Sequence, residues 1–211
     1  MSFEAYLVNG FDDGIVTEPV EDNSLLEAGK GNLVDNNLYP SFVGKVSVSP
    51  VPQVDFGVSG HSGPYNRWRI EGLTVDARRD VSILAADTEI RLDPVEIRGE
   101  AALATVDLPP GVEPLFGERL GGVYGEVVVH GLQGAITVLP DSVFTLGGRY
   151  GFVDANLDAP GDHIHRVTLG MNFRPIESVA FKFDVKRDLI TDPDLNLVHA
   201  VTYAAAAAAY F

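Results

Sequence analysis

The fold is decided by one short stretch of the chain, Ala180-Phe181-Lys182-Phe183-Asp184-Val185-Lys186. Successive side chains of a β-strand point to opposite faces, so Phe181, Phe183 and Val185 would share one face and the three charged residues the other. One face of this strand is suited to lipid or to a protein core, and the other is suited to water.

The same period of two continues in other segments. Apolar residues alternate with polar ones at Val167, Leu169, Met171 and Phe173, at Phe144, Leu146, Tyr150 and Phe152, and at Val95, Ile97, Ala101 and Leu103. A soluble antiparallel sheet alternates as well, because one face packs on a core. Charges of both signs on the polar face, and many small residues on the apolar face, favour lipid as the apolar partner.

Composition limits the fold and the partners. The 211 residues suffice for one domain, residues 1–211, of about ten strands with roughly 9 to 11 membrane-spanning residues each. No apolar run approaches the ~20 residues of a spanning helix. Cysteine is absent, which excludes disulfides and thiolate metal sites. The net charge of −15 argues against a nucleic-acid partner.

Short and long connections alternate along the chain. Proline-containing segments at 49–53, 92–94 and 174–178 read as hairpin turns, because proline fixes φ and removes a ladder donor. A longer turn lies at 134–141. Polar connections separate these hairpins at 12–40, 62–80, 109–120, 154–163 and 188–196. Short periplasmic turns and longer extracellular loops are typical of outer-membrane barrels.

This alternation of short turns and longer connections predicts ten strands. They cover about 3–11, 41–48, 54–60, 81–91, 95–106, 122–132, 143–153, 164–173, 180–187 and 199–211. An even number of antiparallel strands allows the first strand to pair with the last. We therefore expect an all-β, antiparallel up-and-down transmembrane β-barrel of about ten strands.

Aromatic residues are predicted to gather at both ends of these strands. Phe56, Phe144, Phe173, Phe181 and Phe211 fall near the short-turn end, and Phe11, Phe42, Tyr150, Phe152 and Tyr203 fall near the long-loop end. Two aromatic belts are what the two interfaces of a bilayer select.

Four segments, 42–47, 95–100, 140–150 and 167–175, resemble the C-terminal strands of bacterial outer-membrane porins, in particular the phosphate-selective porins. The resemblance implies passive diffusion of small hydrophilic solutes or ions, among them anions such as phosphate. It also implies a location in the bacterial outer membrane, contact with lipid and lipopolysaccharide, no cofactor and no enzymatic activity. The resemblance is compatible with a homo-oligomer and does not define the number of subunits.

Two features depart from that family. Phosphate-selective porins are expected to have around sixteen strands, so this chain would be a truncated or redesigned barrel. Their last strand ends in an aromatic residue, here Phe211, after bulky lipid-facing residues, whereas this chain has six alanines at 204–209. Alanine is a poor strand former. The run could be a small-residue strand, an engineered segment or a stretch of unassigned side chains.

The polar face would line the pore. Its predicted members are Lys45, Asp55, Asp87, Glu89, Arg91, Glu96, Arg98, Glu100, Glu126, Arg149, Arg166, Lys182, Asp184 and Lys186. Within this set Arg149, Arg166, Lys182 and Lys186 would form a cationic patch suited to anions, opposite a group of carboxylates. Alternatively, these charges pair across a narrow lumen and plug it.

Two other functions compete with a pore. The first is a soluble or designed β-barrel with a structural or binding role. The second is an outer-membrane protease of the omptin type, suggested by Asp12-Asp13 and Asp162-His163 in long loops, although their spacing does not reproduce the omptin pattern. His163 and His165 could share a strand face, but a third metal ligand is missing. We predict no metal site and no catalytic residue.

Overall fold

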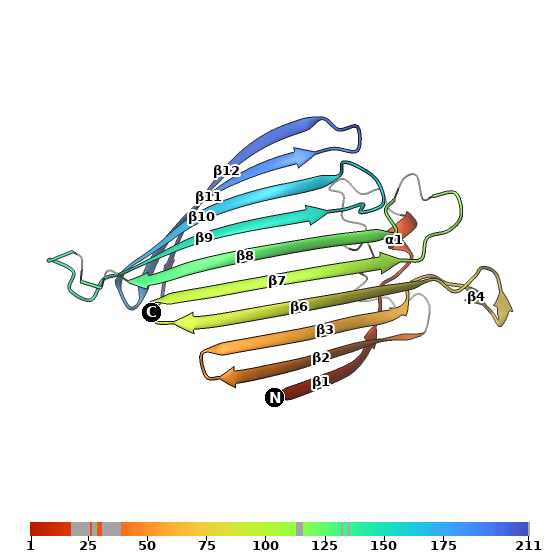
Figure 1. The fold of residues 1–211 in the computed structure, drawn as a ribbon, viewed down its shortest axis with the longest axis horizontal. Helices are drawn as coiled ribbons and strands as arrows, with labels where there is room; N and C mark the ends of the chain where they lie inside the picture. Colours follow the sequence, from red (N-terminus) through yellow and green to blue (C-terminus); the bar gives the residue numbers. More distant parts are fainter. Residues whose placement is uncertain are drawn as a thin grey trace.

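Ten antiparallel strands form one large sheet in the computed structural model, which describes residues 1–17, 26, 29–30, 39–112, 116–131, 133–134 and 136–210 (Figure 1). Each strand pairs with the next along the chain. In order across the sheet the strands are β1 Ser2–Asn9, β2 Pro40–Val51, β3 Val54–Pro64, β6 Asp80–Leu92, β7 Val95–Val106, β8 Arg119–Gly131, β9 Val143–Asp154, β10 His163–Ile176, β11 Val179–Thr191 and β12 Leu197–Ala209.

The predicted all-β antiparallel fold and its ten strands are confirmed. Two further elements lie in the long connections: a hairpin of β4 (Arg69–Ile70) and β5 (Leu73–Thr74), and the short helix α1 (Gly14–Thr17). Leu132 and Phe211, the predicted last residues of two strands, lie outside the described residues.

Proline shapes the predicted hairpins as expected. The register between β2 and β3 shifts between Val48 and Val51, around Pro50, and that between β10 and β11 shifts between Phe173 and Ile176, around Pro175. Because proline has no N–H to give to a ladder, regular pairing is interrupted beside it. The chain reverses direction just beyond these points, at Pro52-Gln53 and at Glu177-Ser178.

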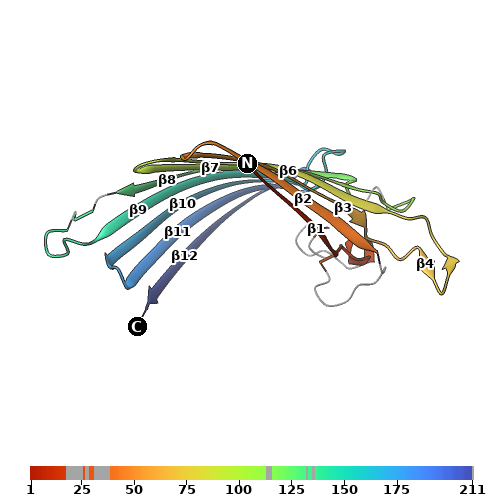
Figure 2. The ribbon, with the colours of Figure 1, turned by 90° about the horizontal axis from the view of Figure 1, so that it is seen from below.

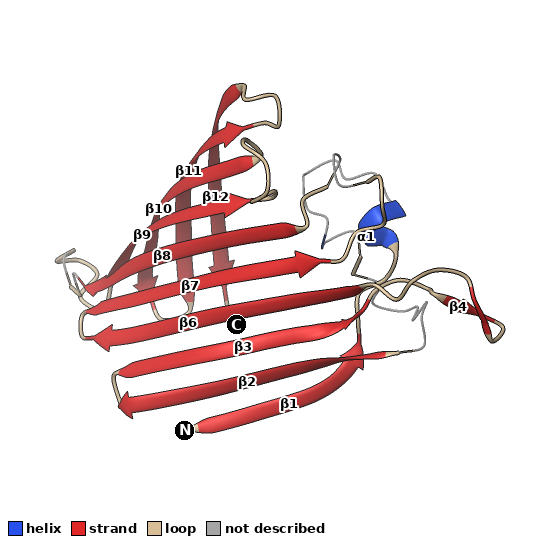
Figure 3. Cartoon of the chain, turned by 45° about the vertical axis from the view of Figure 1, so that its right-hand side comes forward, coloured by secondary structure: helices blue, strands red, loops and turns tan. Residues whose placement is uncertain are grey.

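The sheet is not closed, so the predicted ten-stranded closed barrel is wrong. β1 and β12 are the two edge strands, and the expected pairing of 3–11 with 199–211 does not occur. The sheet curls, with β12 seen behind the earlier strands in Figure 3, but its edges stay apart. An even strand number permits closure, whereas closure itself needs a matching tilt and stagger of the strands.

The alanine run is a strand. Residues 204–209 belong to β12, where Ala205 lies opposite Phe183 and Ala207 lies opposite Phe181 of β11. The thirteen-residue ladder with β11 satisfies the backbone of β12 on one side, and this pairing overrides the helix preference of alanine. β12 presents its other side as an edge of the sheet.

The register separates the sheet into two faces. Residues directly opposite each other in an antiparallel pair share a face. The pairs Asp55 with Glu89, Glu89 with Arg98, Arg98 with Glu126 and Glu126 with Arg149 therefore place these five charged residues on one side. The other side is apolar and uncovered, as the exposed Leu84, Leu103, Val123 and Leu169 illustrate.

The polar face is the concave one. Val81 and Val106, which face each other on the polar side of β6 and β7, form a buried cluster with Ile15 of α1, Tyr65 and Leu108. The helix α1, at the red end of the chain, lies beneath the arch of the sheet (Figure 2). Side chains that contact α1 therefore point into the concavity. We call the two sides the concave face and the convex face.

Candidate functional site

Every predicted pore-lining residue lies on the concave face. The cross-strand pairs link Glu4 to Lys45, Asp87 to Glu100, and Arg166 to Asp188, and continue through the intervening strands without a change of side. The predicted residues found on this face are Lys45, Asp55, Asp87, Glu89, Arg91, Glu96, Arg98, Glu100, Glu126, Arg149, Arg166, Lys182, Asp184 and Lys186.

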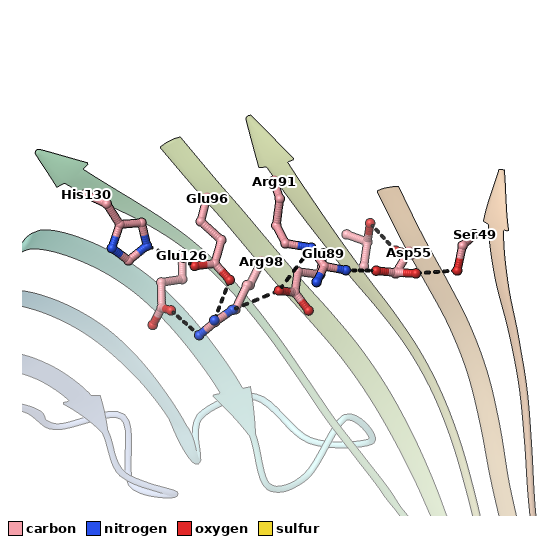
Figure 4. Close-up of polar contacts among 9 residues, drawn as sticks. Ser49, Asp55, Glu89, Arg91, Glu96, Arg98, Glu126 and His130 are labelled. Carbon is pink, nitrogen blue, oxygen red and sulfur yellow. Dashed lines mark hydrogen bonds and ion pairs between the residues drawn. The ribbon is translucent and has the colours of Figure 1, made fainter. Parts of the chain in front are cut away.

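A row of charged side chains crosses the concave face from β3 to β7 (Figure 4). Asp55 accepts hydrogen bonds from Ser49 of β2 and Arg91 of β6. Arg91 Nε lies 3.7 Å from Glu89 Oε1, and Arg98 Nε of β7 lies 4.0 Å from the same oxygen. Neighbouring strands are thus joined by alternating charges.

The row continues to β8. Arg98 pairs with Glu96, and its Nη1 lies 3.6 Å from Glu126 Oε1. His130 Nε2 lies 3.1 Å from Glu96 Oε2 at the end of the row. The two guanidinium groups of Arg91 and Arg98 thus contact four carboxylates, those of Asp55, Glu89, Glu96 and Glu126. The negative charges outnumber the positive ones, so the row is anionic. These pairs run along the sheet, either within one strand or between adjacent strands.

A separate ion pair lies beside this row. Lys45 Nζ contacts Asp87 Oδ1 at 2.8 Å. Both side chains are more than a third exposed, so the pair contributes little to stability. They line a shallow hollow together with Glu100 and Tyr124. Carboxylates therefore outnumber cations over β3, β6, β7 and β8.

The predicted cationic patch is brought together on β9, β10 and β11. Arg166 donates two hydrogen bonds to Asp188, from Nε to Oδ1 at 2.7 Å and from Nη2 to Oδ2 at 2.8 Å, so its charge is neutralised by this carboxylate. Arg149 stacks over the ring of Tyr124 instead of a carboxylate. Within the described part of the chain, Lys182 and Lys186 take part in no ion pair. This side of the concave face is consequently the cationic one.

Sequence reasoning missed Glu4, His130 and Asp188 on the concave face. Asp188 neutralises Arg166, and His130 ends the row at Glu96. Asp188 stands two residues beyond Lys186 and His130 four beyond Glu126, so the period of two would have placed both on the polar side. The partners of these side chains depend on the register between strands, and the sequence of a single strand does not define that register.

Near the long loops the concave face becomes apolar. A cavity of about 290 Å³ lies there, lined mainly by aliphatic and small residues of β6 to β11, with Leu26 at its border. Its sheet residues include Ile83, Ala104, Leu120, Val153, Ile164 and Ile190. Asp162 also borders the cavity, and burial raises the pKa of its carboxyl group. The concave face is thus charged along the middle of the strands and apolar near the long loops.

The convex face carries aromatic groups at both strand ends. Phe173 lies 4.5 Å from Phe144 and 6.4 Å from Phe181, ring centre to ring centre, near the short turns. Near the long loops the hydroxyl group of Tyr150 lies 2.8 Å from His165 Nδ1. Two of the predicted belt members do not fit: Phe11 packs into the α1 cluster, and Tyr203 lies opposite Val185 in mid-strand.

The rings of His163 and His165 lie 5.4 Å apart. Among the described residues, no three His, Cys, Asp or Glu side chains are grouped as a metal ion would require. Asp12 and Asp162 lie in connections at the same end of the strands. No helix in the described ranges has the length and apolar character needed to cross a membrane.

No protein-family model matches the chain, and no curated protein sequence is significantly similar to it. The two faces of the sheet are therefore the features from which we infer a function.

Proposed function

We propose that this chain forms the wall of a porin-like pore in the bacterial outer membrane. The convex face contacts lipid and the acyl chains of lipopolysaccharide, and the concave face lines a path for small hydrophilic solutes and ions. The path needs no cofactor and no catalytic residue.

One observation carries the proposal, namely that the polarity of the curved sheet is inside out. A soluble curved sheet packs apolar side chains in its concavity and presents polar ones to water. Here the charges lie inside, while Leu84 and Leu169 on the convex face are 60 and 62% exposed. Contiguous exposed apolar surface of this kind marks contact with a membrane or a partner. Apolar residues outward and polar residues inward is the arrangement of a transmembrane barrel.

The charges on the concave face support passage of ions. Arg149, Lys182 and Lys186 have no ion pair within the described residues, and they lie on β9 and β11, the two strands on either side of β10. Rings and patches of charge set the ion preference of a pore. We propose that this patch attracts small anions such as phosphate, while the carboxylates of β3 to β8 moderate that preference.

A soluble or designed sheet with a structural or binding role is the second candidate. It requires a protein partner, instead of lipid, to cover the convex face. The two candidates differ in how the purified chain behaves without lipid. The omptin-type protease is not proposed, because the spacing of Asp12-Asp13 and Asp162-His163 does not reproduce the omptin pattern.

The test begins with detergent dependence. We expect the chain to stay monodisperse only in detergent, to migrate differently on a gel before and after heating, and to resist carbonate extraction from vesicles of phosphatidylcholine and phosphatidylglycerol. In planar bilayers it should give discrete conductance steps. A chain that is monodisperse in plain buffer and is removed from vesicles by carbonate would contradict the proposal.

A further inference from the structure

Within the part of the chain that the structure describes, the two edges of the sheet have unpaired backbone groups. There β1 and β12 each hydrogen-bond to one neighbouring strand and present a free side along their length. An open sheet edge is not tolerated against lipid, because no water is present there to satisfy the N–H and C=O groups. If the convex face lies in a membrane, as proposed above, both edges need a partner strand.

Neither edge carries the features that keep edge strands from pairing. Such strands usually contain lysine, proline or a bulge. β12 has no charged residue, proline or glycine between Leu197 and Ala209, and β1 has a single charge, Glu4, and no proline or glycine. Both ladders to the inner neighbours are regular. The edges are therefore competent to extend the sheet.

We propose that a second copy of this chain closes the sheet, with β12 of each copy pairing with β1 of the other. The inference rests on the proposed membrane location. Because ten strands alternate in direction, β1 runs antiparallel to β12, and a two-fold axis along the barrel would make both seams antiparallel. The polar face of each copy then points into one shared lumen. The eight residues of β1 fit along the thirteen of β12.

Charge complementarity selects this pairing over the symmetric ones. Glu4 lies on the concave face of β1, and Lys182 and Lys186 lie on the concave face of β11, next to β12. Joining β12 to β1 places Glu4 two strands from these lysines, about 10 Å between backbones. Pairing β1 with β1 would instead place two copies of Glu4 on adjacent strands, and pairing β12 with β12 would leave the lysines of the two copies three strands apart, without Glu4 beside them.

The small side chains of the alanine run fit this seam. Ala204 and Ala206 are the concave residues of β12 that lie opposite Asp184 and Lys182. Their methyl groups leave space for the long side chains of Glu4 and the lysines to meet across β12. On the other face, Ala205 and Ala207 let the seam flatten against lipid. Small residues at these positions thus suit a strand that lies between two charged neighbours.

The resulting barrel would contain twenty strands from two chains. That size falls between the 16 to 18 strands of barrels with an aqueous channel and the 22 strands of barrels with a plugged lumen. Around its wall, anionic and cationic stretches would alternate twice. The α1 cluster of each copy would narrow the mouth near the long loops.

Disulfide crosslinking tests this seam, because the chain has no cysteine of its own. Ala5→Cys is placed in one tagged copy, and Val201→Cys, Tyr203→Cys, Ala205→Cys or Ala207→Cys in a second, differently tagged copy. The copies are coexpressed, reconstituted in vesicles and oxidised. We expect a disulfide-linked pair of chains from at least one mixture, and little from either variant alone.

Several outcomes would overturn the inference. Crosslinks from Ala5→Cys alone would show that β1 pairs with β1, and a link within one doubly substituted chain would show that the sheet closes on itself. Absence of any crosslink, with a mass of 22.7 kDa by native mass spectrometry, would show a single copy. If that single copy still resists carbonate extraction, the membrane proposal stands and only the seam fails.

A charge swap gives an independent readout. Glu4→Lys should reduce the crosslinked fraction several-fold, and adding Lys182→Glu and Lys186→Glu to the same chain should restore it. Glu71→Lys, which changes the net charge by the same amount in the exposed turn of the β4–β5 hairpin, serves as the comparison for altered net charge. Equal crosslinking in all variants would contradict the proposed charge pairing.

Discussion

The guanidinium group of Arg149 lies 3.7 Å from the centre of the Tyr124 ring, on the neighbouring strand of the concave face. A cation over an aromatic ring keeps its charge, because the ring contributes no formal charge to cancel it. This contact lies where the carboxylate-rich strands β3 to β8 meet the cationic strands β9 to β11. Arg149 therefore holds a positive charge at the boundary between two regions of opposite sign.

Removing the cationic patch should change ion preference. In the triple variant Arg149→Gln, Lys182→Gln and Lys186→Gln, we expect the ratio of anion to cation permeability to fall roughly two- to fivefold. A unit charge near a hydrated ion contributes about 1 kcal/mol in water, which supports a change of this size. Reversal potentials in a potassium chloride gradient measure the ratio. Arg69→Gln, in the β4 hairpin, is the matched control, and an unchanged ratio in the triple variant would contradict a role for the patch.

Breaking the charged row should cost little stability but shift selectivity. Arg98 contacts Glu89, Glu96 and Glu126, and its side chain is 46% exposed. Exposed ion pairs contribute up to about 1 kcal/mol each, so Arg98→Met should lower the free energy of unfolding by about 1 to 2 kcal/mol. The carboxylates it leaves behind should favour cations. Urea unfolding from vesicles measures the first effect, and a loss above about 4 kcal/mol would indicate a buried network instead.

Tyr65 should make the loop end sensitive to alkali. Its ring is fully buried, its hydroxyl group donates a 2.6 Å hydrogen bond to the carbonyl oxygen of Asp107, and burial raises its pKa to about 12. Below pH 10 the phenol is neutral in both the folded and the unfolded chain, so it adds no pH dependence. Between pH 10 and 12 only the unfolded chain ionises, so stability should fall as pH rises.

The size of this alkaline loss follows from the pKa difference. A difference of about two pKa units corresponds to about 3 kcal/mol above pH 12. Thermal unfolding at pH 9 and pH 11, compared with that of Tyr65→Phe, isolates the effect of this one group. The parent chain should lose more stability than the variant between the two pH values. Equal losses would show that the phenol ionises in the folded protein.

Substitutions on the convex face should separate lipid from water. Arg187 is the charged residue furthest from a strand end on this face, where it lies opposite Val167 and Val201. A lipid-facing Arg costs about 2 to 4 kcal/mol at mid-membrane and about 0 to 1 kcal/mol near an interface. We expect Arg187→Leu to be neutral or stabilising by about 1 kcal/mol, and Leu169→Arg to be destabilising by about 2 to 3 kcal/mol. A harmless Leu169→Arg would mean that water reaches this face.

Much of the sheet could be predicted from the sequence, because each strand carries its own period of two and each hairpin its own proline. Lys182, Asp184 and Lys186 show their common face without any knowledge of the neighbouring strands. Closure could not be predicted, because alternation says which way a side chain points and nothing about total curvature. The α1 cluster could not be predicted either. Val81 and Val106 are apolar, so the sequence suggests the convex face for them, whereas in the structure they lie on the concave face and are covered by Ile15.

The most direct test of the central claim is an alternation of lipid contact along β10. Single cysteines at the convex positions Val167, Leu169 and Met171 and at the concave positions Thr168 and Asn172 can be labelled with a fluorophore in vesicles. Nitroxide-labelled lipid should quench the convex labels strongly and the concave labels weakly, and aqueous iodide should do the reverse. Equal quenching by iodide at both sets of positions would contradict an apolar face turned to the membrane.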